Sequence, residues 1–408
     1  MCKKGAEKMP DMIDNAVKDI TLAGKALAAP LSPSILILTA SIGSGHVKAA
    51  EAVARELLRL CPGSRISIVD FTRWGTSWTN AFMKDVYLLM LRFVPNLYNL
   101  MYRFSGGRYG GLSIQSLISL LTQPDIKAML KKYKPDMIVS THPFPAGAVS
   151  WYRSEEKRGG FGASTVITDY SIHQMWIYPH IDKYFVARET MKTDLIAAGL
   201  SPEQVHVTGI PIAVSEDTRT KEEIAAGFHV DISRPVVLLM GGGLGLGGVI
   251  EVLHELERVP EPLELLVVAG KNEELLQSAK EAALKSHHRI KVWGYTDRVH
   301  DLMRISTVLV SKPGALTITE ALALRLPMVL HSPIPGPETE NAVYIARRGA
   351  AIWVGKGKTT GSAVAEAVTS PEKLREMQEA AAKLAKPSAA EDIARVLLEE
   401  SRESCNIG

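Results

Sequence analysis

Short apolar runs alternate along the chain with segments in which apolar residues recur at helical spacing. The first series of runs is SILILTA at 34–40, RISIVDF at 65–71, PDMIVSTH at 135–142 and STVITDY at 164–170. The second series is RPVVLLM at 234–240, LELLVVAG at 263–270, RIKVWGY at 289–295, STVLVSK at 306–312 and LPMVLHS at 326–332. Because strands that alternate with helices form parallel sheets, the pattern predicts an α/β fold with two doubly wound sheets.

A polar stretch with prolines at 209–221 separates the two series and predicts a hinge between two domains. The chain has 408 residues, which is enough for two cores, because a single core stops growing at about 250–300 residues. We expect an N-terminal domain at 31–212 and a C-terminal domain at 213–385. Residues 386–408 would form a last helix that packs back on the N-terminal domain, and residues 1–30 a leader segment outside the fold.

Composition limits the class of protein. Hydrophobic residues at 46% and charged residues at 22% are ordinary for a packed α/β protein. A net charge of only +3 argues against a nucleic-acid-binding protein. Cys2, Cys61 and Cys405 are too scattered for a zinc site or a disulfide framework, which favours a reducing cytoplasm. No apolar stretch reaches the length of a membrane-spanning helix.

The small net charge hides a basic N-terminal region, because basic residues far outnumber acidic ones between 65 and 134. Aromatic residues are interleaved with them, and those expected at a lipid surface, together with one cation, are Trp74, Trp78, Phe82 and Arg92. Rings at headgroup depth and cations near anionic lipid are typical of a protein bound to one face of a membrane. The alternative is that much of VYLLMLRF at 86–93 is helix core.

Glycines follow the strand at 234–240, in the sequence GGGLGLGG at 241–248. Residues without side chains let backbone N–H groups approach a diphosphate, and the next helix would present its positive end to the same anion. The GxGxxG spacing within this loop is also typical of dinucleotide-binding dehydrogenases, which are therefore an alternative class for this protein. That reading needs an acidic residue at the end of the next strand, where Gly270 and Lys271 stand instead. A plain flexible turn is the third alternative.

A second candidate loop follows the strand that ends at Ser311. Pro313 and Gly314 predict a tight turn, and Thr317 opens a helix that carries Glu320. The helix start suits a phosphate, and a carboxylate one turn later can accept both hydroxyls of a ribose. The alternative for Glu320 is that it only complements the helix dipole. Further on, PIPGPETEN at 333–341 would present polar groups to a sugar on a rigid loop.

These motifs, with SIGSGH at 41–46, resemble the lipid-directed glycosyltransferases that include monogalactosyldiacylglycerol synthase and the bacterial processive diacylglycerol glucosyltransferases. The similarity covers most of the chain from about 34 to 385. VITDYSIHQMWIYPHIDKYFVAR at 166–188 is typical of the bacterial branch. The resemblance implies a GT-B fold, in which two Rossmann-like domains face a central cleft. The C-terminal domain would bind a UDP-sugar and the N-terminal domain a lipid acceptor.

The resemblance also assigns residues. Gly242 and Gly243 would face the donor phosphates, Gly294 and Tyr295 would lie by the uracil, and Glu320 would bind the ribose. Near the sugar, Glu338 and Asn341 match the family pattern PGQEKEN, in which Pro337 here replaces the glutamine. Because of this departure, the sequence does not determine which sugar is transferred, and we favour glucose over galactose. The acceptor side would include His142, His173 and Trp176.

His46 is the residue that the resemblance places beside the acceptor. Transfer to a hydroxyl needs a base, and the positive end of a helix would keep an imidazole neutral. Asp169 is a candidate to orient or assist the base, or else a carboxylate that caps a turn. His142 and His173 are weaker alternatives for the base, and a purely structural role for His46 is the remaining one. The sequence lacks the Asp-x-Asp of metal-dependent transferases, so we expect no cofactor and no obligatory metal.

The expected activity is inverting transfer of a hexose from a UDP-sugar to diacylglycerol, which gives a β-glycolipid and continues on the enzyme's own product. The expected location is the cytoplasm, peripherally on the inner face of the cell membrane. One alternative is transfer of N-acetylglucosamine to a polyprenyl-linked peptidoglycan precursor. A second is a non-catalytic protein that binds nucleotide sugars or lipids, and a third is an NAD enzyme.

Overall fold

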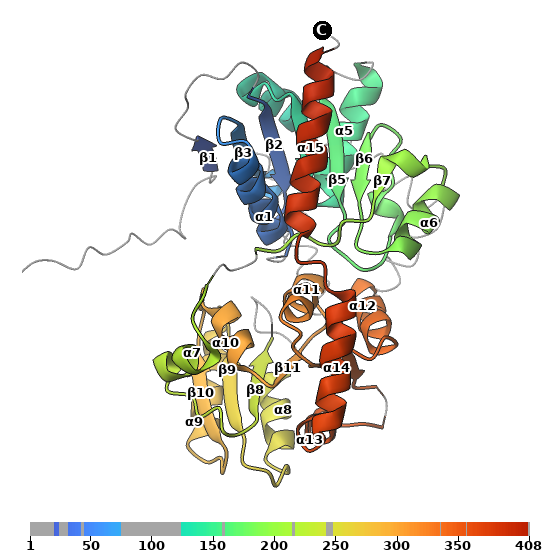
Figure 1. The fold of residues 1–408 in the computed structure, drawn as a ribbon. Coiled ribbons are helices and arrows are strands. Elements are labelled where there is room, and N and C mark those ends of the chain that lie inside the picture. Colours follow the sequence, from blue (N-terminus) through green and yellow to red (C-terminus); the bar gives the residue numbers. More distant parts are fainter. Residues whose placement is uncertain are drawn as a thin grey trace, which may run out of the picture.

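The fold comes from a computed structural model, which describes residues 20–23, 32–41, 45–74, 124–156, 160–213, 217–241, 248–334, 336–355 and 357–406. Two α/β domains lie one above the other, and the chain passes between them twice (Figure 1). The first passage lies between strand β7 (Val205–His206) and helix α7 (Lys221–Phe228). The second leads from helix α14 (Pro371–Leu384) to helix α15 (Ala389–Asn406).

Within the described residues, the N-terminal sheet has seven strands in the order β1-β3-β2-β4-β5-β6-β7. All neighbours pair in parallel except β1 with β3. The other strands are β2 (Ser34–Thr39), β3 (Arg65–Asp70), β4 (Met137–Ser140), β5 (Gly162–Val166) and β6 (Lys183–Phe185). The helices are α1 (Gly45–Leu60), a helix at 124–133, α5 (Pro143–Glu155) and α6 (Glu189–Ala197), with short 3₁₀ turns η1 (Phe71–Arg73), η2 (Gln174–Trp176) and η3 (Pro202–Gln204).

Strand β1 (Ile20–Ala23) corrects the expectation that residues 1–30 lie outside the fold. It pairs antiparallel with β3, from Ile20 opposite Ile68 to Ala23 opposite Arg65. An edge strand of a parallel sheet has unpaired N–H and C=O groups, and a short antiparallel strand satisfies them. The segment ITLA has only four residues in a region rich in lysine, so the hydrophobic pattern does not predict a strand there.

The C-terminal sheet has six strands among the described residues, in the order β10-β9-β8-β11-β12-β13, all parallel. They are β8 (Val236–Met240), β9 (Glu264–Val268), β10 (Arg289–Trp293), β11 (Val308–Ser311), β12 (Met328–Leu330) and β13 (Ala351–Trp353). The helices besides α7 and α14 are α8 (Val249–Leu256), α9 (Glu273–Ala283), α10 (Val299–Ile305), α11 (Ala315–Ala323), α12 (Pro337–Ala346) and α13 (Thr360–Val368).

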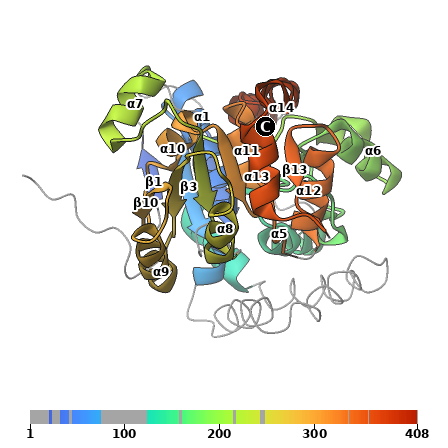
Figure 2. The ribbon, with the colours of Figure 1, turned by 90° about the horizontal axis from the view of Figure 1, so that it is seen from below.

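Helices cover both faces of this sheet, as the view from below shows (Figure 2). Along β8, Leu238 packs in a cluster with residues of α10, α11 and α12, whereas Val237 and Leu239 pack with α8, α9 and α13. Successive side chains of a strand point to opposite faces, so each buried strand supplies two cores. The strands therefore read as continuous apolar runs in the sequence.

Helix α15 crosses back to the N-terminal domain and runs along it in Figure 1. Ile393, Ala394 and Leu397 are buried in one cluster with Val53 and Leu57 of α1. The two passages between the domains touch each other where Lys386 Nζ donates to the Val207 carbonyl at 2.8 Å. The last helix of the chain thus belongs to the core of the first domain.

Candidate functional site

Three strand ends of the N-terminal domain converge on His46. The residue lies in the first turn of α1, which follows β2, while Thr141 directly follows β4 and Thr168 follows β5. His46 Nδ1 lies 2.9 Å from the Thr141 carbonyl oxygen and 2.8 Å from the Thr168 Oγ1. Parallel strands end at the same edge of a sheet, which is where α/β proteins bind their ligands.

Aromatic rings enclose the His46 imidazole on the side of helix α5. The ring of His142 meets it edge to face at 4.6 Å between centroids, and the Trp176 ring lies at 6.4 Å. This enclosure removes water from the ring and lowers the pKa of His46 to about 4, while the hydrogen bond to Thr141 acts in the opposite direction. His46 is therefore neutral at pH 7, mainly because of burial.

The two other candidate histidines cap helices. His142 Nδ1 accepts from the Phe144 backbone N–H at 3.2 Å at the start of α5, and His173 Nδ1 accepts from Met175 N–H at 3.2 Å at the start of η2. Burial, together with the neighbouring His46, lowers the pKa of His142 well below its usual value. A ring nitrogen that accepts from the backbone is not available as a base. Among these histidines, His46 is the better placed for proton transfer.

Asp169 turns toward the C-terminal domain. Burial is the largest effect and raises the pKa of Asp169 to about 6. Asn341 and Lys312 of the C-terminal domain lower the pKa of its carboxyl, whereas Glu338 and Glu340 of the same domain raise it. The groups that contact His46 Nδ1 are instead Thr141 and Thr168, and the role expected for Asp169 stays a prediction.

Asn341 links the two domains. The side chain is completely buried in the first turns of α12. Its Oδ1 accepts from the Tyr170 backbone N–H at 3.2 Å, and its Nδ2 donates to the Pro313 carbonyl at 3.2 Å. One amide thus joins the loop after β5 to the loop after β11.

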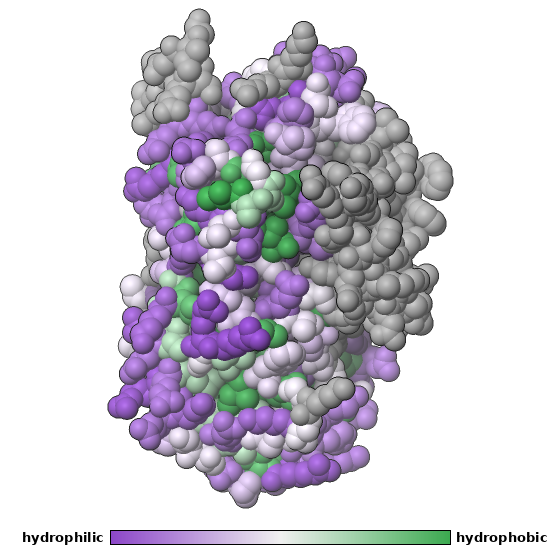
Figure 3. Space-filling view, turned by 90° about the vertical axis from the view of Figure 1, so that its right-hand side faces the viewer, coloured by the Kyte–Doolittle hydropathy of each residue, from purple (hydrophilic) through white to green (hydrophobic). Residues whose placement is uncertain are grey.

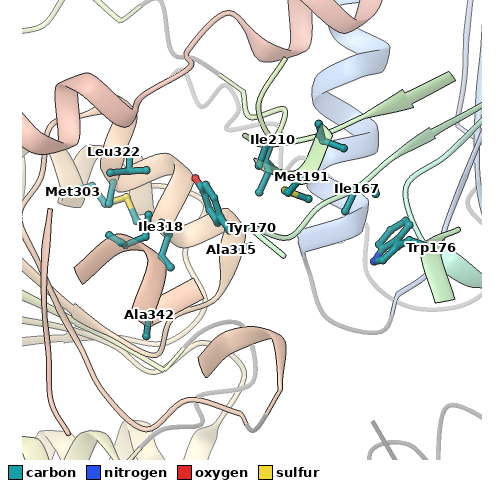
Figure 4. Packing of buried hydrophobic residues seen from close by; sticks show 14 of the residues in the cluster. Ile167, Tyr170, Trp176, Met191, Ile210, Met303, Ala315, Ile318, Leu322 and Ala342 are labelled. Carbon is teal, nitrogen blue, oxygen red and sulfur yellow. The ribbon is translucent and has the colours of Figure 1, made fainter. Parts of the chain in front are cut away.

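Helix α11 supplies the second connection between the domains. The Tyr170 hydroxyl lies 2.8 Å from Thr319 Oγ1, which itself donates to the Ala315 carbonyl, so Tyr170 is the donor to Thr319. Tyr170 lies beside Ala315 and Ile318 in Figure 4, within a hydrophobic cluster that extends through both domains. Glu320, one position further, lies 3.8 Å from Lys48 Nζ of α1. Burial raises the pKa of Glu320, and Lys48 opposes this effect.

An ion pair joins the loop before α11 to the first turn of α12. Lys312 pairs with Glu338, whose second oxygen accepts from the Ile334 N–H at 2.8 Å. Gly314 begins α11 without a side-chain cap, and half-buried Thr317 lies in the first turn. Gly336, at φ 100° and ψ −121°, places Pro337 at the first position of α12, where a missing N–H costs nothing. Pro337 therefore fits the local backbone.

The expected uracil contacts lie at the end of β10. Tyr295 is 61% exposed, and the ammonium of Lys271 lies 5.6 Å from the centre of its ring. A Cβ at Gly294 would lie 3.5 Å from Leu276 and 3.7 Å from the Gly270 carbonyl. An exposed aromatic ring beside two glycines offers a flat surface on which a base can stack.

Comparison with known proteins decides the family. Residues 46–212 match the family model for monogalactosyldiacylglycerol (MGDG) synthase, and residues 236–397 match the glycosyltransferase family 28 C-terminal domain. A processive diacylglycerol beta-glucosyltransferase of Bacillus licheniformis is 30% identical over 371 residues, which cover 90% of this chain and 95% of the relative. The protein of the same name from Bacillus cytotoxicus is 30% identical over 389 residues, with 92% and 96% covered. The chain is a family 28 glycosyltransferase.

Solved structures agree on the fold of this glycosyltransferase. MurG of Acinetobacter baumannii superimposes with a TM-score of 0.58 at 16% identity and covers 90% of this chain and 100% of its own. S. aureus MnaA, solved with UDP, gives the same TM-score and identity, with 88% and 94% covered. The GT-B fold expected from the resemblance is confirmed, with two Rossmann-like domains. The resemblance to the diacylglycerol-directed branch is also confirmed, and the protein is a glycolipid glycosyltransferase.

Several expected residues of the glycosyltransferase lie outside the described residues: Trp78, Phe82, Arg92, Gly242 and Gly243. Of the expected membrane residues, Trp74 packs on the Tyr133 ring at 5.8 Å and under the ammonium of Lys132 at 4.9 Å. Trp176, expected on the acceptor side, is buried beside His46. In the described part of the chain, no helix is both long and apolar enough to cross a bilayer, and no cluster of three His, Cys, Asp or Glu side chains could hold a metal ion.

Sequence reasoning missed four residues that the structure brings into the candidate site: Lys48, Thr141, Thr168 and Tyr170. The last two flank Asp169, which drew attention because it is charged. Their position in the sequence was the available signal, because Thr141 and Thr168 stand one and two residues after the ends of strands β4 and β5. Small hydroxyl residues at such strand ends are candidates for positioning a neighbouring group.

Proposed function

We propose that the enzyme transfers a hexose, glucose rather than galactose, from a UDP-sugar to the hydroxyl of diacylglycerol. The product is a β-glycolipid, and the enzyme repeats the transfer on its own product. The observation that carries this proposal is the 30% identity along nine tenths of the chain to proteins named processive diacylglycerol beta-glucosyltransferase. The neutral His46 at the edge of the acceptor domain supports the same chemistry.

His46 acts as the base in this proposal. As the acceptor oxygen attacks the anomeric carbon, its proton passes to the imidazole, and the bond from that carbon to the diphosphate oxygen breaks. Attack opposite the leaving UDP converts an α-linked donor to a β-glycoside. Burial supports the role, because it keeps the imidazole unprotonated at neutral pH and ready to accept a proton.

The C-terminal domain binds the donor. Helices α8, α11 and α12 all begin without a side-chain cap after a parallel strand, so backbone N–H groups are available for the diphosphate. Glu320 accepts from the ribose hydroxyls, and Tyr295 and Gly294 contact the uracil. Glu338 and Asn341 lie near the sugar and shape its site through their bonds to Lys312, Ile334, Pro313 and Tyr170.

The acceptor arrives from an anionic membrane surface, on the inner face of the cell membrane. On the helix at 124–133, Ile126, Met129 and Tyr133 are buried, whereas Lys127 and Lys131 are exposed. Exposed lysines beside a packed apolar face suit binding to anionic lipid. On the side drawn in Figure 3, hydrophobic patches interrupt an otherwise hydrophilic described surface. No cofactor enters the proposed reaction.

The test supplies UDP-glucose or UDP-galactose with diacylglycerol in vesicles of increasing anionic lipid content. We expect a β-glucolipid, identified by the anomeric coupling in NMR, and a rate that rises with anionic lipid. His46→Ala should lower kcat by at least about a hundredfold, since general base catalysis contributes about 10²–10⁴. His254→Ala, on the exposed side of α8, is the control and should retain activity. Absence of turnover with any UDP-hexose would contradict the proposal.

A further inference from the structure

The contacts of His46 determine which of its ring nitrogens carries the proton. The Thr141 carbonyl oxygen, 2.9 Å from Nδ1, has no hydrogen to give, so Nδ1 must be the donor in that contact. The Thr168 hydroxyl oxygen, 2.8 Å from the same nitrogen, then accepts a share of the same hydrogen. In the neutral ring the lone pair therefore lies on Nε2, which is the nitrogen left to act as a base.

The two partners are held independently of each other. The Thr141 hydroxyl donates to the His46 backbone carbonyl at 3.1 Å, which ties the end of β4 to the start of α1. Thr168 lies just after the next strand, β5, and it is almost completely buried. Of the two acceptors of Nδ1, Thr141 contributes a backbone carbonyl and Thr168 a side-chain hydroxyl. Only the Thr168 acceptor can therefore be removed by substitution.

Proton uptake strengthens the contact with Thr168. When Nε2 takes a proton, Nδ1–H becomes more positive, and hydrogen bonds from a charged donor are about twice as strong as neutral ones. The rings of His142 and Trp176 lie against this ring, so few other polar groups are placed to stabilise the imidazolium. An oxygen at 2.8 Å from Nδ1 is therefore well placed to do so.

We propose that Thr168 is a positioning residue that holds His46 in the Nδ1–H tautomer and stabilises its protonated form during glycosyl transfer. This inference rests on the proposed function, in which His46 is the base. Thr168 itself does not exchange protons with the acceptor. Asp169, the adjacent carboxylate, is influenced by Asn341 and Lys312 of the other domain.

The test is Thr168→Val, which keeps the branched shape and removes the accepting oxygen. A hydrogen bond to a charged group is worth about 1.5–3 kcal/mol, so kcat should fall about ten- to a hundredfold. The KM for the UDP-sugar should stay within about twofold. Because the imidazolium loses a partner, the acid limb of kcat/KM should move to lower pH. Thr168→Ser should restore kcat to within about threefold, whereas Thr168→Ala should not.

Thr165→Val is the matched control, three residues earlier on β5. The Thr165 hydroxyl is also buried, and among the described residues it has no hydrogen-bond partner. This variant should have wild-type kcat and an unshifted pH profile. In parallel, ¹⁵N NMR of His46 at pH 7 should show protonated Nδ1 and unprotonated Nε2 in the wild type.

The outcomes separate the two proposals. If His46→Ala is inactive while Thr168→Val has the kcat and the pH profile of the wild type, the positioning role is overturned and the base remains. A lower kcat with an unmoved acid limb, or failure of serine to rescue, also overturns it, because that pattern indicates a packing role. If His46→Ala remains active, the proposed base itself is wrong. An NMR spectrum with protonated Nε2 contradicts the tautomer directly.

Discussion

Burial sets the pKa values of two residues at the boundary between the domains, His46 and Asp169. The pKa of His46 falls to about 4 and that of Asp169 rises to about 6, in both cases mainly because burial disfavours the charged form. At pH 7 the histidine is therefore neutral and ready to accept a proton. Asp169 is mostly ionised there, and it keeps its charge at a cost in stability.

Asp169→Asn should stabilise the protein at neutral pH. The folded state binds the Asp169 proton more tightly than the unfolded state does, so stability falls as pH rises from about 4 to about 6 and stays low above that range. A shift of this size corresponds to about 2 kcal/mol once partial exposure is allowed for. We expect a higher Tm for Asp169→Asn at pH 7.5 and little change at pH 4.5. Equal changes at both pH values would show that the charge is not the cause.

At the scale of elements, α15 is part of the N-terminal core although it comes last in the sequence. Leu397 is completely buried among residues of α1, β2, β3 and β4, whereas Glu399 is exposed on the same helix. An amphipathic helix forms stably when its apolar face is covered by other elements. The first domain therefore depends on the end of the chain.

Leu397→Ala should lower the free energy of unfolding by about 2–5 kcal/mol, because it leaves a cavity in a packed core. Urea unfolding followed by circular dichroism measures the change. Glu399→Ala, the control on the exposed face, should change stability by less than about 0.5 kcal/mol. If the two variants are equally stable, α15 does not pack on α1 in solution.

Across the whole molecule, specific polar contacts join the two domains beside the hydrophobic cluster that they share. They include the Asn341 amide, the Tyr170–Thr319 hydrogen bond and the Lys48–Glu320 ion pair. The ion pair is partly exposed and worth little, whereas the buried amide leaves two backbone groups without partners if it is removed. Of these three contacts, the Asn341 amide therefore contributes most to holding the domains together.

Asn341→Ala should destabilise the protein by about 2–4 kcal/mol, since the Tyr170 N–H and the Pro313 carbonyl each lose a buried partner. The radius of gyration in small-angle X-ray scattering should increase as the domains separate. Asn272→Ala removes the N-cap of α9 inside one domain. This control should cost about 1 kcal/mol without a change in the radius of gyration. An unchanged radius for Asn341→Ala would show that other contacts suffice for closure.

The sequence by itself determined the two series of parallel strands and the family resemblance, and it singled out His46 as a candidate. These features are local, because a buried strand between helices must be apolar and a strand-to-helix turn has its own composition. Strand β1 was missed because its cause is not local: ITLA becomes a strand only through its pairing with β3.

Only the tertiary structure decided which groups hold His46 and which way Asp169 faces. Thr168 is 122 residues from His46 and Thr141 is 95 residues away, and adjacent strands of a parallel sheet bring all three to one edge. Sequence reasoning favoured Asp169 for its charge, but a one-residue step turns it toward Asn341 of the other domain. The charge of a residue can be read from the sequence, whereas the direction in which its side chain points depends on how the strands and the two domains pack.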